Sequence, residues 1–197
     1  MSSTEKVLEL LGQQGGYLTS TRARESKIDN KTLQRMTNRN QIERVAHGLY
    51  VDVNIMPDRF YIAQYRCPKG VFSHDTALFL HDLSDRDPLR LTMTIPSGWN
   101  SQLLTDANMI FFYCEPKRIL LGAREIETTS GVRVNVYDVE RTLCDCLKNI
   151  DKLDRDLVLT ALKRYASGNN RDNAKLLEYA NSMKIRDIVY RYLEVLE

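Results

Sequence analysis

The chain has 197 residues, of which 43% are hydrophobic and 27% charged, a composition typical of folded proteins and too apolar for a disordered one. Its longest apolar runs, such as residues 110–114, are far shorter than the roughly 20 residues that a transmembrane helix needs. The first residues do not place a basic segment before an apolar one, which argues against a secretory signal. The sequence therefore predicts a cytoplasmic protein that does not bind membranes.

The net charge is only +2, but it is unevenly distributed. Residues 1–50 contain eight Lys or Arg and five Asp or Glu, whereas residues 51–197 contain 20 and 21. A contact with nucleic acid is therefore expected in the first quarter of the chain.

Three short helices are predicted in the first 40 residues, at 2–12, 20–26 and 30–39. Each begins at a side chain suited to capping a helix, namely Ser2, Thr19 or Ser20, and Asp29. The third helix is amphipathic, with an inward face made of Leu33, Met36 and Thr37. Lys31 and Arg35 lie on the opposite side of that helix, one turn apart.

Two β-prone runs, 42–45 and 49–51, surround a turn with a glycine and predict a hairpin. Three helices and a hairpin in about 50 residues match the plan of a winged helix-turn-helix, in which the third helix enters the major groove and the hairpin is the wing. The alternative is a small structural helical cap with a solvated basic face.

We expect the DNA contacts to come from the second helix, the third helix and the hairpin. Cationic side chains one turn apart can reach successive phosphates or guanine edges, and amides and hydroxyls can bond to base edges. The candidate DNA-binding residues are Thr19, Thr21, Arg22, Asn30, Lys31, Thr32, Gln34, Arg35, Asn38, Arg39, Arg44 and His47.

The remainder of the chain is predicted to mix helices and strands. Helices are expected at 57–65, 72–83 and 138–149, and strands at 89–95, 109–114, 119–121 and 132–136. The last 45 residues are expected to be helical, with a turn at 167–170 and one apolar face made of Ile185, Ile188, Val189, Tyr192, Leu193 and Leu196. The predicted fold class is α+β: a winged helix-turn-helix DNA-binding domain, residues 1–55, followed by a mixed α/β domain with C-terminal helices, residues 56–197.

Several segments resemble those of one protein family. They include Gly16-Tyr17-Leu18-Thr19, residues 28–36, residues 42–50, residues 72–83 and the stretch 136–145 with Arg141-Thr142-Leu143-Cys144-Asp145. Together they resemble the AbiEi-type antitoxins of bacterial AbiE abortive-infection systems, over most of residues 1–150. The chain departs from that family at residues 38–41, where relatives often have more basic residues and a glycine, and at His47, where arginine is frequent.

The resemblance implies a two-part protein of phage defence that is not an enzyme and needs no cofactor. Its N-terminal domain would bind inverted repeats in the promoter of its own operon and act as a transcription repressor. Its C-terminal antitoxin domain would neutralise a nucleotidyltransferase-like toxin encoded beside it. In these type IV toxin–antitoxin systems a stable complex between toxin and antitoxin is not required.

Two patterns point to metal chemistry instead. Asp106 followed by Glu115-Pro116-Lys117 imitates the Asp…Glu-x-Lys signature of metal-dependent nucleases, so a winged-helix nuclease is the alternative function. Pro116 removes a strand donor between the two side chains, which favours a turn. The pairs His74-Asp75 and His81-Asp82 share a helix face, but residues seven apart are about 10 Å apart along the axis, too far for one ion.

Other reactive or aromatic side chains have structural explanations. The four cysteines, Cys67, Cys114, Cys144 and Cys146, form no CxxC pair, which predicts reduced, buried thiols. The sequence contains no glycine-rich phosphate loop and no recognisable nucleophile motif. Four C-terminal tyrosines either form a partner surface, as in a pure interaction module, or pack against the central sheet: Tyr165, Tyr179, Tyr190 and Tyr192.

Overall fold

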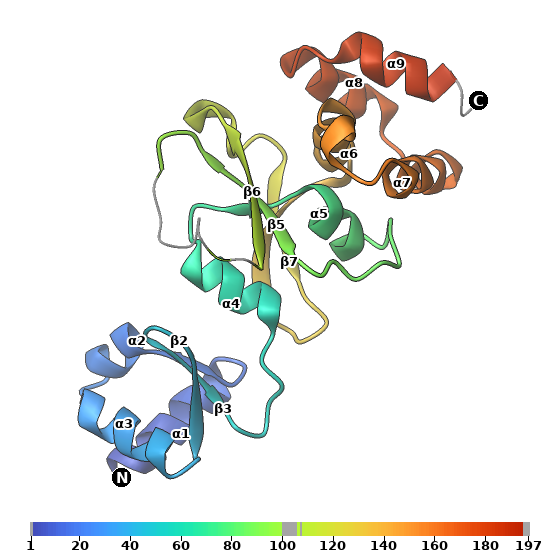
Figure 1. Ribbon diagram of the computed structural model, residues 1–197. Helices are drawn as coiled ribbons and strands as arrows, with labels where there is room; N and C mark the ends of the chain where they lie inside the picture. Colours follow the sequence, from blue (N-terminus) through green and yellow to red (C-terminus); the bar gives the residue numbers. More distant parts are fainter. Residues whose placement is uncertain (1, 100–105, 107, 195–197) are drawn as a thin grey trace. The chain divides into compact units, whose positions relative to one another are not determined.

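The computed structural model describes residues 2–99, 106 and 108–194, and the chain divides into two compact units (Figure 1). The first unit comprises Met1–Arg66 with Thr129–Val132, and the second comprises Cys67–Thr128 with Arg133–Glu197. Both combine helices with a sheet, so the predicted α+β class is confirmed. The expected domain boundary at residue 55 falls before the last helix of the first unit.

The first unit contains four helices and a three-stranded antiparallel sheet. The helices are α1 (Ser3–Gln13), α2 (Ser20–Glu25), α3 (Asn30–Asn38) and α4 (Arg59–Arg66). The strands are β1 (Tyr17–Thr19), β2 (Ile42–Ala46) and β3 (Leu49–Asp52), in the order β1-β3-β2. The predicted helix starts are confirmed, because the side chains of Ser2, Thr19 and Asp29 each accept a hydrogen bond from the backbone N–H three residues later.

The hairpin β2–β3 is fixed to the rest of the first unit at its turn. The carbonyl of Gly48 accepts hydrogen bonds from the N–H of Ser20, at 2.8 Å, and from the hydroxyl of Tyr65 in α4, at 3.1 Å. Gly48 has a φ of +74°, and a Cβ at this position would lie 2.7 Å from Ser20 Oγ. Glycine is therefore needed here both for the backbone conformation and for the close approach of α2.

Two apolar clusters hold the first unit together. One joins α1, α2, α3 and β2 through residues that include Val7, Leu11, Ala23, Leu33 and Met36. The other contains Tyr17, Leu49, Val51 and, from the distant segment Thr129–Val132, the side chain of Val132. The short strand β1 was not predicted, because its three residues become a strand only by pairing with β3.

The second unit is built on a five-stranded mixed sheet. The strands are β4 (Val71–Phe72), β5 (Leu91–Pro96), β6 (Met109–Cys114), β7 (Ala123–Glu127) and β8 (Arg133–Tyr137), in the order β6-β5-β4-β8-β7. The β5–β6 and β4–β8 pairs are parallel, and the β4–β5 and β7–β8 pairs are antiparallel. The helices are α5 (His74–Leu80), α6 (Val139–Lys148), α7 (Arg155–Ser167), α8 (Asn173–Ser182) and α9 (Arg186–Glu194), with short 3-10 turns η2 (Pro116–Arg118) and η3 (Ile150–Lys152).

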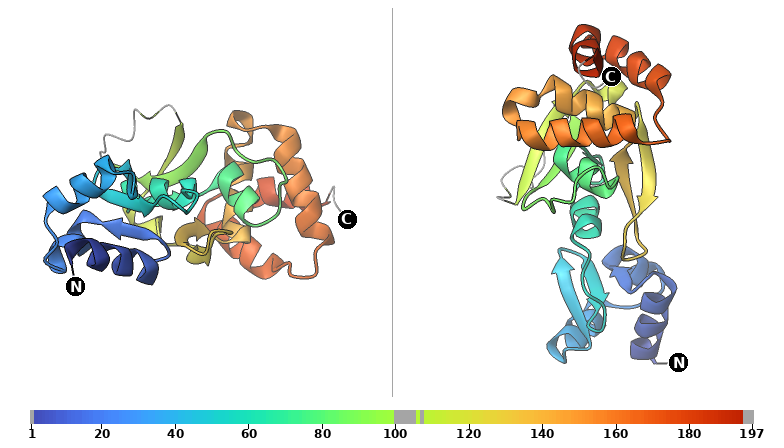
Figure 2. Two further views of the ribbon diagram at one scale, coloured as in Figure 1. Left: turned by 90° about the horizontal axis from the view of Figure 1, so that it is seen from below. Right: turned by 90° about the vertical axis from the view of Figure 1, so that its right-hand side faces the viewer.

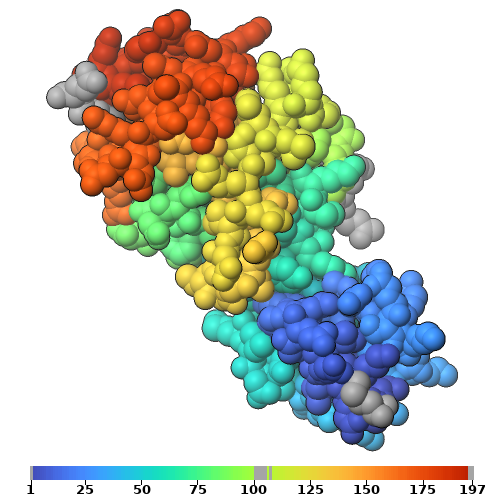
Figure 3. All heavy atoms as spheres, turned by 180° about the vertical axis from the view of Figure 1, so that it is seen from behind, coloured from blue at the N-terminus to red at the C-terminus, as the bar shows by residue number. Residues whose placement is uncertain are grey.

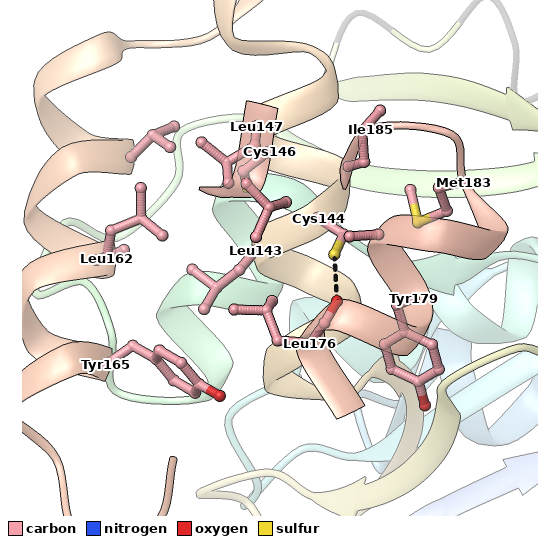
Figure 4. Packing of buried hydrophobic residues seen from close by; sticks show 14 of the residues in the cluster. Leu143, Cys144, Cys146, Leu147, Leu162, Tyr165, Leu176, Tyr179, Met183 and Ile185 are labelled. Atoms are coloured by element: carbon pink, nitrogen blue, oxygen red, sulfur yellow. Dashed lines mark hydrogen bonds between the residues drawn. The ribbon is translucent and has the colours of Figure 1, made fainter. Parts of the chain in front are cut away.

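The C-terminal helices gather on one side of this sheet (Figure 2), and the space-filling view shows their orange and red atoms together in one region of the surface (Figure 3). These helices enclose an extended apolar cluster. Leu143 and Leu147 of α6 meet Leu162 of α7 and Leu176 of α8 (Figure 4). The thiol of Cys144 donates to the carbonyl of Leu176 at 3.6 Å. The buried Tyr165 and Tyr179 belong to this helical cluster.

Two sequence predictions differ from the structure. Residues 119–121 form a turn and not a strand, and the neighbouring strand is β7 instead. The helix expected at 72–83 covers only His74–Leu80, because Val71 and Phe72 are taken into the sheet as β4. Leu196 lies outside the described residues. Within the described ranges, none of the helices is both long and apolar enough to span a membrane.

Candidate nucleic-acid interface

Helix α3 has one buried and one exposed face. Asp29 begins the helix by accepting a hydrogen bond from the N–H of Thr32 at 2.8 Å. Leu33 and Met36 are fully buried in the core of the first unit. The opposite face is exposed and carries six of the predicted DNA-binding residues, namely Asn30, Lys31, Gln34, Arg35, Asn38 and Arg39.

A groove of about 520 Å³ lies between α2, α3 and the hairpin β2–β3. It brings together side chains from three elements: Ser20, Arg24, Asn30, Gln34, Thr37, Asn38, Arg44, His47, Gly48 and Tyr50. Five of these were predicted as DNA-binding residues from the sequence, and they are Asn30, Gln34, Asn38, Arg44 and His47. The groove therefore unites the third helix and the hairpin in one surface.

The cations of α3 have no partner of their own. In the part of the chain that the structure describes, neither Lys31, Arg35 nor Arg39 has a carboxylate oxygen within 4.0 Å. Hydrogen bonds from Thr32, followed by the smaller effects of Arg35 and Lys31, lower the pKa of Asp29, which keeps this cap ionised. The positive charge of the exposed face is therefore free to meet the charge of a ligand.

Arg44 and His47 are held together at the end of the hairpin. Arg44 donates from Nη2 to His47 Nδ1 at 2.9 Å and from Nε to the carbonyl of Ala46 at 3.4 Å. Since a guanidinium can only donate, His47 carries its proton on Nε2, which leaves that N–H available. The hairpin thus presents a cation and a ring donor at the edge of the groove.

The remaining predicted residues have different positions. Thr32 is only 7% exposed, so it does not lie on the open face of α3 as we expected. On a helical wheel it lies beside the buried Met36. Thr19 uses its hydroxyl to cap α2 by accepting from the N–H of Arg22. Thr21 and Arg22 are exposed but do not line the groove, and Arg22 forms an ion pair with Glu25 at 3.3 Å.

Sequence reasoning missed five residues that line the groove, namely Ser20, Arg24, Thr37, Gly48 and Tyr50. Thr37 was expected on the inward face of the third helix, but it is half-buried and lines the groove. Arg24 lines the groove from the last turn of α2. Ala23 is the only buried residue of this six-residue helix, and the packing of α2 against α3 and the hairpin decides which of its neighbours reach the groove.

The residues of the nuclease pattern do not form a metal site. Glu115 is exposed after the end of β6, and its carboxylate lies 3.1 Å from Lys117 Nζ and 3.7 Å from Arg118 Nε. These cations lower the pKa of Glu115, with the hydrogen bond from Lys117 as the largest cause. Across residues 2–99, 106 and 108–194, no group of three or more His, Cys, Asp or Glu could hold a metal ion.

The two histidines of the second unit have partners within the protein, and His74 is buried whereas His81 is half-buried. The ring of His74 stacks on Phe112 with centroids 3.7 Å apart, and its Nδ1 lies 2.9 Å from Ser73 Oγ. Burial, with a smaller effect of Arg141, lowers the pKa of His74 to about 3. His81 donates from Nε2 to the carbonyl of Tyr137 at 2.7 Å. The two imidazoles thus connect the two ends of α5 to the sheet, His74 through Phe112 of β6 and His81 through Tyr137 of β8.

The buried charged residues of α6, Glu140, Arg141 and Asp145, are paired within the protein. Arg141 Nε lies 3.0 Å from Asp145 Oδ2, and the Arg141 guanidinium also bonds to the carbonyl of Leu121 at 2.9 Å. Asp138 caps α6 and lies 2.8 Å from Lys175 Nζ and 3.0 Å from the hydroxyl of Tyr179. The segment around residues 136–145 is thus a structural network that joins α6 to α8.

Comparison with known proteins supports the resemblance seen in the sequence. Residues 5–51 match the family described as "Transcriptional regulator, AbiEi antitoxin", and this segment contains every residue that lines the groove. No curated protein matches the chain. The crystal structure of the RV2827C protein from Mycobacterium tuberculosis shares the fold, with a TM-score of 0.64 and 11% sequence identity over 98% of this chain and 80% of that one. The resemblance of the N-terminal segment to the AbiEi antitoxin transcriptional regulators is therefore confirmed over residues 5–51.

Proposed function

We propose that the protein is the antitoxin of an AbiE-type toxin–antitoxin system and represses its own operon. The observation that carries this proposal is the groove of the first unit with the unpaired cations beside it, since both lie in the segment that matches the AbiEi family. A cationic face without protein partners is what a polyanionic ligand requires.

In this proposal the first unit acts as a winged helix-turn-helix. The order α1-β1-α2-α3-β2-β3 supports this assignment, with α3 as the helix that enters the major groove and β2–β3 as the wing. Lys31, Arg35 and Arg39 would neutralise phosphates, and the hairpin would approach the neighbouring backbone or minor groove through Arg44 and His47. Two copies would occupy the two halves of an inverted repeat, as the symmetry of such a site demands.

The second unit would supply the antitoxin activity against a nucleotidyltransferase-like toxin. The two activities would then be separable within the full-length chain. Replacing Lys31 and Arg35 by alanine is expected to abolish repression of a promoter fusion while rescue of cells from the co-expressed toxin is retained.

The direct test is fluorescence anisotropy with a labelled duplex from upstream of the gene, compared with a scrambled duplex over a range of salt concentrations. We expect the wild-type chain to prefer its own promoter. The Lys31→Ala/Arg35→Ala variant should bind weakly, and its slope of log affinity against log salt should be lower by about 1.8, because two phosphate contacts are lost. The matched control is Lys163→Ala/Arg191→Ala, which removes the same charge from exposed positions of the second unit and should behave as the wild type.

Two results would overturn the proposal. One is a wild-type chain that binds promoter and scrambled duplex equally. The other is cleavage of the duplex when magnesium is added, which would favour the nuclease and direct attention to Glu115 and Lys117.

A further inference from the structure

Three carboxamide side chains form a line along the exposed face of α3. Asn30, Gln34 and Asn38 are four residues apart, so they follow one another along the helix at intervals of about 6 Å. All three are exposed and all three line the groove. We call them the amide stripe.

The side chains of the amide stripe do not stabilise the fold through hydrogen bonds within the described residues. Among the residues that the structure describes, none of the three amides has a side-chain hydrogen-bond partner. Their neighbour Thr37, by contrast, donates its hydroxyl to the carbonyl of Leu33 at 2.9 Å. Each amide therefore keeps one carbonyl acceptor and one NH₂ donor group available, side by side.

The cations of α3 form a second, parallel line. Lys31, Arg35 and Arg39 are also four residues apart, displaced from the amides by about 100° around the helix. They do not line the groove, and they can only donate hydrogen bonds. The helix thus separates side chains that recognise charge from side chains that recognise a pattern of donors and acceptors.

Adenine is the base whose major-groove edge matches a carboxamide. It offers the N7 acceptor and the N6 amino donor together, whereas guanine offers two acceptors and calls for arginine or lysine. The amide stripe spans about 12 Å, which corresponds to roughly four base-pair steps of about 3.4 Å. Its length therefore fits a short run of base pairs in one half-site.

We propose that the amide stripe reads adenines in the major groove of each operator half-site, and that the line of Lys31, Arg35 and Arg39 holds the phosphates. This inference rests on the proposed function, because it requires α3 to lie in the major groove. It also specifies which residues determine the preferred DNA sequence and which base they select.

The first experiment is selection of binding sites from a pool of randomised duplexes by the full-length chain. The wild type should enrich half-sites that contain adenines. Gln34→Ala should lose discrimination at one position, by about 5- to 150-fold, while its dependence on salt stays that of the wild type. Gln34→Arg should change the preference at that position from adenine to guanine. Gln14→Ala, which removes an exposed amide elsewhere in the first unit, is the matched control and should leave the selected sequence unchanged.

The second experiment tests the atom that is read. The selected operator is prepared with 7-deazaadenine, which pairs normally but replaces the N7 acceptor by C–H. The wild type should lose affinity for the substituted duplex, whereas the alanine variant at the residue that reads the position should bind both duplexes equally.

The outcomes separate this inference from the proposed function. The wild type could select a defined sequence that has no A·T pair at a fixed position, or the selected sequence could be unaffected by alanine at all three amides. In either case the amide stripe does not read the DNA, and the repressor proposal still stands. If the wild type selects no sequence at all, both proposals fall. Unchanged thermal unfolding of each variant would show that the loss does not come from a damaged fold.

Discussion

The two units use the same helical spacing of charged side chains in opposite ways. In α6 of the second unit, Arg141 and Asp145 are four residues apart, 2% and 6% exposed, and form an ion pair. In α3 of the first unit, Lys31 and Arg35 are also four residues apart, but they are exposed and carry like charges. The first pair is bonded within the chain, whereas among the described residues neither Lys31 nor Arg35 has a carboxylate oxygen within 4.0 Å. The Arg141–Asp145 pair therefore stabilises the fold, whereas Lys31 and Arg35 are available to a ligand.

The energies involved in the two cases differ about tenfold. Removing one member of a buried ion pair costs about 3–5 kcal/mol, because the other member stays buried and unpaired. Like charges four residues apart on an exposed helix cost about 0.2–0.5 kcal/mol. Variants in the two helices should therefore differ clearly in their effect on stability.

The largest effect is expected for Arg141→Ala. The free energy of unfolding of the second unit should fall by about 3–5 kcal/mol, since Asp145 would be left buried without its partner. Denaturant unfolding followed by the fluorescence of Trp99, the only tryptophan of the chain and part of the second unit, measures it. The matched control is Arg141→Met/Asp145→Leu, which removes both charges and should cost less. Equal stability of Arg141→Ala and the wild type would mean that the ion pair does not support α6.

A smaller effect is expected from pH. Burial holds His74 neutral, with its pKa lowered from 6.5 to about 3, so the unfolded chain binds a proton that the folded chain does not. Stability should therefore fall as the pH falls below 6.5, by about 2 kcal/mol between pH 6.5 and 4.5 from this residue. His74→Asn, which tolerates the positive φ of this position, should flatten the pH dependence of unfolding. Parallel curves for variant and wild type would contradict this account.

Gly48→Ala should cost the first unit about 1–2 kcal/mol, because a non-glycine residue is strained at its positive φ. The variant should also weaken binding to the promoter duplex, since Ser20 must give way and the hairpin would be displaced. Circular dichroism and anisotropy measure the two effects. Gly12→Ala in α1 is the control, because a Cβ there meets nothing within 4 Å and alanine favours the helix by up to about 1 kcal/mol. If both variants behave alike, the turn does not position the hairpin.

The smallest effect on stability is expected for Lys31→Ala/Arg35→Ala. The free energy of unfolding should change by less than about 0.5 kcal/mol, with a slight gain from the relief of repulsion. Thermal unfolding monitored by circular dichroism is sufficient to detect a larger change. A loss above about 1 kcal/mol would place these cations among the structural charges, and the distinction between α3 and α6 would disappear.

The elements that the sequence predicted well are those defined by local interactions. Ser2, Thr19, Asp29 and Asp138 each begin a helix where the capping residue and the apolar period agree. The hairpin β2–β3 follows from its own turn. The short strands β1 and β4 depend on partners far along the chain, so no local pattern indicates them. Strand β7 pairs with the next strand, β8, but its residues Ala123–Glu127 include only one β-branched residue, Ile126.

The candidate site was predictable to the extent that it lies on one helix. The exposed face of α3 follows from the positions of Leu33 and Met36, but Thr32 belongs to the buried side and Arg24 comes from another helix. Which side chains of α2 reach the groove depends on how α2, α3 and the hairpin pack together. This packing is tertiary structure, and helical periodicity alone does not predict it.

The segment Thr129–Val132 limits how the molecule can be cut or recombined. It belongs to the first unit, although the chain on both sides of it belongs to the second, so the first unit is discontinuous in sequence. A fragment ending at Arg66 lacks Val132, one of the residues that pack with Tyr17, Leu49 and Val51. A single crossover between two genes after codon 66 would therefore combine the first unit of one protein with a segment of its core, Thr129–Val132, from another protein. Exchange of such units among relatives should require either two matched crossovers or compensating changes around Tyr17.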